Sequence, residues 1–156
     1  MCPTLFESAL LQVASNIHIY PDEDIEFLPV NIKDKLLLTI TRSPTLTNKL
    51  NLNLCLPLLL HNRTRILSIP FLYKKNLHKL SEDLINQLYK CPELMVLILP
   101  DYMKCSPKAL VNCFVKLPNL ERLEMKHCDG VTHDVLKVLW RNCPKLRIKP
   151  GEILFI

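Results

Sequence analysis

The sequence predicts an α/β fold, in which a short solenoid of stacked strand–helix units follows a small helical N-terminal module. Three observations support this prediction. Leu94, Leu120 and Leu146 stand 26 positions apart, each two residues after a proline. Within each unit the spacing of apolar residues changes from an extended to a helical pattern. Before residue 44, two further stretches have helical spacing only.

Each repeat unit combines a short extended run with an amphipathic helix. The run L-x-x-L-x-L begins at Leu94, returns at Leu120 with Met in its last position, and opens a third copy as Leu146-x-Ile148. The apolar positions between the runs keep the same offset: Leu84 and Leu88, Leu110 and Phe114, Leu136 and Trp140. A period of about 20–29 residues is typical of leucine-rich repeats, which bury their apolar faces by stacking. The predicted fold class is therefore an α/β leucine-rich-repeat solenoid with a small helical N-terminal module.

The N-terminal module is predicted to contain two helices. Thr4 and Glu7 have the spacing of a capping box at the start of the first helix. Its apolar residues follow at four-residue spacing: Leu5, Ala9 and Val13. After the acidic stretch 21–24, Leu28-Pro29 introduces a second helix. One face of that helix carries Ile32, Leu36 and Ile40.

The module boundary is placed near Ser43-Pro44, because a Ser-Pro pair favours a turn. The predicted domains are residues 1–44, the helical module, and residues 45–156, the repeats. Between Leu50 and Leu56 leucines alternate with other residues, which indicates a strand or an irregular first repeat. The segment 66–69 is a second strand candidate, and a helix is expected over residues 80–90.

Composition excludes several classes of protein. With 156 residues, of which 49% are hydrophobic, the chain has ample core for a folded domain. No uninterrupted apolar stretch approaches the roughly 18 residues of a membrane span, and no signal peptide is recognisable. We expect a cytoplasmic or nuclear protein whose seven cysteines are small buried hydrophobic residues. The net charge of +5 is scattered, so nucleic-acid binding is a minor alternative.

No catalytic or cofactor-binding motif is present in the sequence. The two glycines are isolated, so no phosphate-binding glycine-rich loop can be built. No nucleophile elbow positions a serine. A zinc site was considered for His127, Cys128, His133 and Cys143, but their spacing lacks a C-x-x-C pair. We therefore expect a protein that is not an enzyme and that needs neither cofactor nor metal.

Two regions resemble parts of ubiquitin-ligase substrate receptors. The unit from Leu120 to Leu146, with Cys128 and Cys143, closely resembles their cysteine-containing leucine-rich repeat. The pattern Thr4-Leu5-x-x-x-Ala9-x-x-x-Val13 resembles the elongin-binding box, and Leu28-Pro29-Val30-x-Ile32 resembles the cullin box that follows it. Together these regions resemble the N-terminal part of the Zyg/Zer family of cullin-2 substrate receptors.

That resemblance implies partners and roles for the two boxes. Elongin B/C would bind the adaptor-docking residues Thr4, Leu5, Ala9 and Val13, and cullin-2 would contact Leu28, Pro29, Val30 and Ile32. Ala9 replaces the cysteine usual in the family, which reduces the contact area. Asn31 stands where a cullin-5 type box has a second proline, which favours cullin-2. The ubiquitin chemistry would belong to the partners.

Other interpretations of the module remain open. Leu28-Pro29-x-x-Ile32-x-x-x-Leu36 also resembles the start of an F-box, which docks on a Skp1-type adaptor, although residues 45–60 lack the expected aromatic residues. The first helix could instead only cap the open end of the solenoid. The chain would then be a plain leucine-rich-repeat scaffold with no link to a ligase.

Substrate recognition is predicted on the concave face of the repeats. In each extended run the leucines point inward and the intervening residues outward. This arrangement places apolar contacts beside charged groups that could pair with an acidic peptide. The predicted substrate-binding residues are Met95, Ile98, Arg122, Glu124 and Arg147.

Overall fold

The computed structural model describes residues 4–70, 72, 76 and 80–147. The N-terminal part is helical, with α1 (Leu5–Ser15), the 3-10 helix η1 (Ile17–Ile19), α2 (Asp22–Glu26), α3 (Val30–Arg42), α4 (Pro44–Lys49) and α5 (Leu52–Leu59). The strands β1 (Ile66–Ser68), β2 (Val96–Ile98) and β3 (Arg122–Glu124) follow, separated by helices. These helices are α6 (Glu82–Gln87) with the 3-10 helix η3 (Leu88–Lys90), α7 (Pro107–Phe114) and, after β3, α8 (His133–Asn142).

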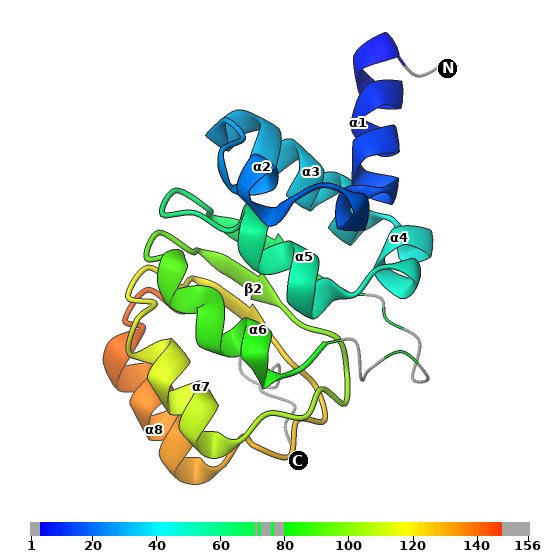
Figure 1. Cartoon of the computed structure of the whole chain (residues 1–156). Helices are drawn as coiled ribbons and strands as arrows, with labels where there is room; N and C mark the ends of the chain where they lie inside the picture. Colours follow the sequence, from blue (N-terminus) through cyan, green and yellow to red (C-terminus); the bar gives the residue numbers. More distant parts are fainter. Residues whose placement is uncertain (1–3, 71, 73–75, 77–79, 148–156) are drawn as a thin grey trace.

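The predicted fold class, a leucine-rich-repeat solenoid, is wrong. Most of the described chain is helical. The described strands are three residues long and form one open parallel sheet in the order β1-β2-β3. Figure 1 shows how far the helices outweigh this sheet. Each leucine run pairs with the neighbouring strand over only three residues. The chain therefore contains less strand than the runs predicted.

The clearest local error is the stretch from Leu50 to Leu56. Its alternating leucines predicted a strand, yet residues 52–59 form helix α5. Leucines at every second position also include pairs four residues apart, so the same sequence satisfies both periods. Leu52, Leu56 and Leu59 are fully buried, so the helical period decides which residues are buried here.

Other local predictions are confirmed. Strand β1 lies within the candidate segment 66–69, and α6 with η3 covers residues 82–90. Leu67 pairs in register with Leu97, and Leu97 with Leu123. The backbone N–H of Arg147 donates to the Glu121 carbonyl at 2.8 Å, so the third run begins beside β3. Ile148, which would continue it, lies outside the described residues.

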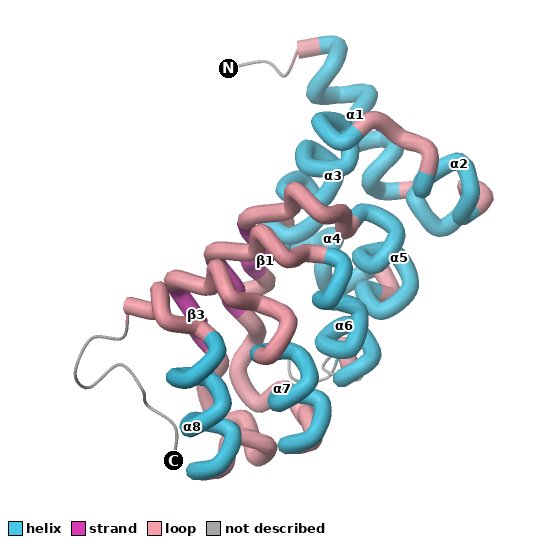
Figure 2. Tube along the Cα trace, turned by 90° about the vertical axis from the view of Figure 1, so that its left-hand side faces the viewer, coloured by secondary structure: helices cyan, strands magenta, loops and turns pink. Residues whose placement is uncertain are grey.

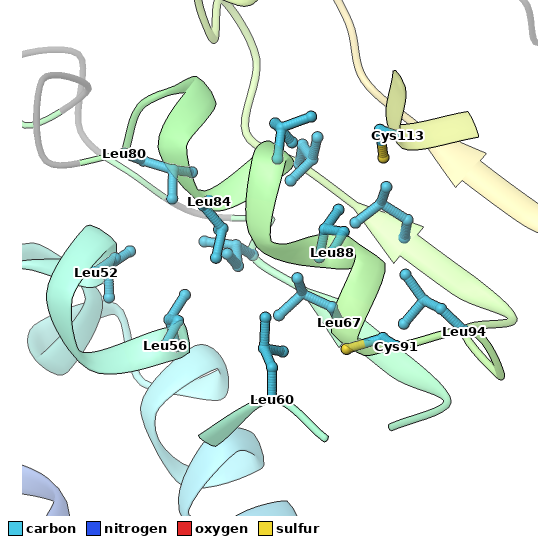
Figure 3. Close-up of a cluster of buried hydrophobic side chains, with 14 of the residues drawn as sticks. Leu52, Leu56, Leu60, Leu67, Leu80, Leu84, Leu88, Cys91, Leu94 and Cys113 are labelled. Carbon is cyan, nitrogen blue, oxygen red and sulfur yellow. The ribbon is translucent and has the colours of Figure 1, made fainter. Parts of the chain in front are cut away.

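One continuous hydrophobic core joins the two predicted domains. A shared core does not locate a boundary, and the division at residue 44 stays a prediction. The cluster extends from Ala14 in α1 to Cys143 after α8. Figure 3 shows leucines of α5, β1 and α6 meeting in this core. Full burial of each such side chain contributes about 1.5–3 kcal/mol to the free energy of folding. The chain from α3 to α8 is therefore held by shared burial.

The described cysteines are free and buried, as expected. Burial raises the pKa of the Cys91 and Cys143 thiols to about 11. The Cys143 thiol donates to the Leu117 carbonyl at 3.4 Å, so it satisfies a backbone group of the preceding unit. Cys128 differs, because a hydrogen bond from the Cys105 thiol lowers the pKa of Cys128.

The loops that follow β2 and β3 are pressed together. Tyr102 and His127 both have positive φ, and their rings stack with centroids 4.6 Å apart. A Cβ atom on Gly130 would lie 1.9 Å from the Cys105 carbonyl oxygen. Only glycine permits so close an approach of the two backbones.

Candidate protein-binding surfaces

Helix α1 packs against α3 along one face and exposes the other face, most of all at its first residue. Ala14 is fully buried, whereas Leu5 is 89% exposed, and Figure 1 shows the start of α1 projecting from the body. The predicted capping box is present: the Glu7 N–H donates to the Thr4 hydroxyl at 3.1 Å, and the Thr4 N–H donates to the Glu7 carboxylate at 2.8 Å. The hydrogen bonds that the Thr4 N–H and the Thr4 hydroxyl donate to the Glu7 carboxylate lower the pKa of Glu7. The cap stabilises the projecting turn without help from the core.

The two faces of α1 differ. Phe6 and Leu10 border a shallow hollow against α3, where the Lys35 ammonium lies 4.4 Å from the centre of the Phe6 ring. Of the predicted adaptor-docking residues, Thr4, Leu5 and Ala9 are exposed and Val13 is partly buried. The predicted docking residues are therefore most exposed at the start of α1 and become partly buried toward its end.

The predicted cullin-binding residues divide into two pairs. Leu28 and Ile32 are partly buried against the core, while Pro29 and Val30 are exposed at the start of α3. Phe27, which the sequence reasoning missed, is 87% exposed directly before them. A large apolar residue beside the acidic stretch was the signal that could have identified it.

Ile19 and Tyr20, before α2, are also exposed, although no prediction included them. Ile19 ends the helix η1, and Tyr20 lies in the short link from η1 to α2. It is followed by exposed acidic residues at Asp22, Glu23 and Asp24. An exposed apolar pair is therefore followed directly in the sequence by an exposed acidic run.

The predicted substrate-binding residues lie on adjacent strands. The register sets Ile98 beside Glu124 and Val96 beside Arg122. The Met95 carbonyl accepts from the N–H of Glu121, whose own carbonyl accepts from Arg147. The register therefore puts Ile98, Arg122 and Glu124 on one face of the sheet, while Met95 and Arg147 lie at the end where the strands begin.

The charges on this side of the sheet are partly paired. The Arg122 guanidinium donates to the Glu124 carboxylate from Nε at 2.7 Å, within one strand. Arg65 stands 3.7 Å from Glu93, and both side chains are largely exposed. Exposed pairs of this kind contribute about 0–1 kcal/mol to stability, so a partner could displace them.

Other observations bear on the predicted absence of metal and membrane segments. Among residues 4–70, 72, 76 and 80–147, no three His, Cys, Asp or Glu side chains gather closely enough to hold a metal ion. The Cys128 and Cys143 side chains considered for zinc are buried. None of the helices in the described part of the chain has the length and apolar character needed to cross a bilayer.

Comparison with known proteins gives one informative similarity. No protein-family model matches the sequence, and no solved structure matches it significantly. Over 65 residues the chain is 30% identical to the F-box protein SKIP1 of Arabidopsis thaliana. The aligned segment covers 42% of this chain and 22% of that protein. The aligned part therefore spans only about a fifth of the length of this curated relative. The similarity agrees, at a coarse level, with the predicted link to ubiquitin-ligase adaptors, and the Zyg/Zer resemblance stays a prediction.

Proposed function

We propose that this protein is a substrate-recognition adaptor of a cullin-type ubiquitin ligase, which docks through its N-terminal helices. The observation that carries this proposal is the number of exposed apolar side chains on the N-terminal helices. Of thirteen exposed large hydrophobic side chains in the described residues, seven fall between residues 5 and 30. These are Leu5, Phe6, Leu11, Ile19, Tyr20, Phe27 and Val30. This share of exposed apolar side chains on the N-terminal helices supports a role for them in binding another protein.

Docking on elongin C would use α1 as a helix laid in a groove. Leu5 projects from a turn already held by its capping box, so little conformational entropy would be lost on binding. If α1 only capped the open end of the repeats, its leading leucine would be buried against the rest of the chain. The 89% exposure of Leu5 favours docking over capping.

Contact with cullin-2 would follow at the start of α3. Pro29 and Val30 are exposed there and available to a partner, and Phe27 adds a third apolar side chain. Leu28 and Ile32 would act indirectly, because their packing against the core holds that turn in place. The acidic residues of α2 would favour a partner surface with basic groups.

An F-box that docks on a Skp1-type adaptor is the second candidate. The similarity to an F-box protein favours it. The helices α3, α4 and α5 follow Leu28-Pro29 directly, but Leu36 is fully buried and so is unavailable to an adaptor. This candidate predicts docking at Pro29 and Val30 without a role for Leu5.

The substrate would bind on the open side of the sheet. Ile66 is exposed beside the partly buried Val96 and Ile98, which gives an apolar strip across β1 and β2. Arg122 already pairs with Glu124, so Arg147 is the better candidate to meet an acidic group of the substrate. This assignment predicts a substrate segment with apolar and acidic residues close together.

A matched pair of leucine variants tests the docking. Purified protein would be incubated with elongin B/C and cullin-2, and separately with a Skp1-type adaptor and its cullin, and binding would be measured by biolayer interferometry. Leu5→Ala should weaken elongin binding by about 2 kcal/mol, because it truncates the side chain that would fill a pocket of the partner. Leu54→Ala is the control, since Leu54 is 70% exposed on α5, outside the docking residues.

Each outcome has a defined meaning. Unchanged elongin binding by Leu5→Ala would reject the elongin box. Binding to the Skp1-type adaptor alone would replace the main proposal with the F-box candidate. Failure to bind either adaptor, under conditions where a known receptor binds, would leave a plain scaffold protein without a ligase.

A further inference from the structure

The last helix exposes a face that its predecessors bury. Leu84 and Leu88 in α6 and η3, and Leu110 and Phe114 in α7, are buried almost completely. Leu136 and Trp140 hold the same positions in the third unit, 26 residues further on. Leu136 is only partly buried, and Trp140 is 49% exposed.

The difference follows from the order of the helices. Helix α6 packs against α7, and α7 packs against α8, in the row that Figure 2 shows. No described helix follows α8. Val135 and Leu139 are the fully buried apolar residues of α8. Leu136 and Trp140 therefore form a face that in the earlier units belongs to the packed interior.

The surroundings of this face are basic. Lys137 stands three residues before Trp140 and four before Arg141, so the two cations form a row along one flank of the Leu136–Trp140 face. From residue 135 to residue 147 there are four basic residues and no acidic ones. Asp134 lies 3.4 Å from Lys137, in a pair too exposed to neutralise it strongly.

We propose that this end face, defined by Leu136, Lys137, Trp140 and Arg141, binds an amphipathic helix of another protein whose flank is acidic. Two arguments select this occupant. The equivalent residues of the two earlier units are buried almost completely within a row of packed helices, so these positions suit contact with an apolar helix face. The lysine and arginine favour carboxylates along one edge of the bound helix.

Other occupants fit the face less well. A second copy packed symmetrically through the same face would bring its own Lys137 and Arg141 against these cations, which is unfavourable. A nucleic acid would use the cations and stack on Trp140, but it would leave Leu136 without an apolar partner. The proposal does not depend on the adaptor function. In an adaptor, the bound helix would belong to the substrate.

The test uses Trp140 as its own reporter, because it is the single tryptophan of the chain. The probe is a synthetic amphipathic peptide with leucines at helical spacing and glutamates along one flank. A second peptide carries lysines in place of the glutamates. Binding of the first should shift Trp140 emission to shorter wavelength, saturably, and the second should bind at least tenfold more weakly.

Variants then locate the site. Lys137→Glu combined with Arg141→Glu should weaken binding of the acidic peptide at least tenfold and leave the circular dichroism spectrum unchanged, since both side chains are exposed. Tyr89→Ala, at an exposed aromatic residue of η3, is the control and should bind normally. Elongin binding, measured on the same variants, should not change, so a failure here is distinct from a failure of the adaptor proposal.

Four results would overturn the proposal. The first is no change in Trp140 emission with the acidic peptide, and the second is equal binding of both peptides. The third is a saturable shift with single-stranded oligonucleotide instead. The fourth is a shift to longer wavelength on deletion of residues 148–156 alone, because the chain's own C-terminal segment would then cover the face.

Discussion

Phe114 and Trp140 hold equivalent repeat positions in different surroundings, so truncating each to alanine measures what the neighbouring helix contributes. Phe114 is the last residue of α7, which packs against α8, and its side chain is only 1% exposed. Trp140 lies on α8, and no described helix follows α8. Removing a fully buried phenylalanine costs about 3–5 kcal/mol, from lost burial and the cavity left behind. Trp140→Ala loses about half of a comparable burial and leaves an open surface, so we expect about 1–2 kcal/mol.

Urea denaturation followed by far-UV circular dichroism gives both values. With a slope of about 2 kcal/mol per molar urea, Phe114→Ala should lower the midpoint by about 2 M and Trp140→Ala by less than about 1 M. A domain of ordinary stability, about 5–15 kcal/mol, would survive either change. An equal loss for both variants would refute the reasoning, because Trp140 would then be as well covered as Phe114.

Two further predictions concern the contacts between successive units. Gly130→Ala should destabilise the protein by more than about 1 kcal/mol in the same assay, because its Cβ would lie 1.9 Å from the Cys105 carbonyl oxygen, and a neutral result would show that the two loops separate readily. The Glu82 carboxylate accepts from the Ser106 N–H at 2.8 Å, and this hydrogen bond lowers the pKa of Glu82. Its stabilising contribution should therefore be complete above the ordinary pKa of glutamate and fall as pH drops through the lower folded-state pKa. Glu82→Gln should accordingly differ from the unmodified protein near neutral pH and converge with it in acid, and a constant difference at every pH would contradict this assignment.

Local chemistry made part of the structure predictable. The capping box of Thr4 and Glu7 and the Leu28-Pro29 start of α3 depend on neighbouring residues only, and both appear in the structure. Helix α5 was predicted incorrectly because a leucine-rich stretch satisfies two periods at once, and only its packing against α3 and α6 selects the helix. The proportion of helix to strand likewise depends on tertiary packing, which the spacing of apolar residues in the sequence does not reveal.

The exposure of individual residues was less predictable than their secondary structure. Leu88 and Trp140 occupy the same place in the sequence pattern, yet only one is covered, because coverage depends on the next helix in the row. Phe27 likewise looked like an ordinary apolar residue beside Leu28, and its exposure follows from the turn between α2 and α3. A candidate surface therefore depends on tertiary neighbours, which a single sequence specifies only indirectly.

The contacts of α1 with α3 fix the direction in which α1 projects from the body. A protein held at Leu5 would be oriented relative to the body by the angle at which α1 leaves α3, and the Phe6–Lys35 contact helps to set that angle. In the proposed adaptor, substitution of Lys35 would change the orientation of a docked ligase relative to the bound substrate while leaving the docking residues unchanged. In such an adaptor, the position of the ligase would depend in part on a residue that recognises neither partner.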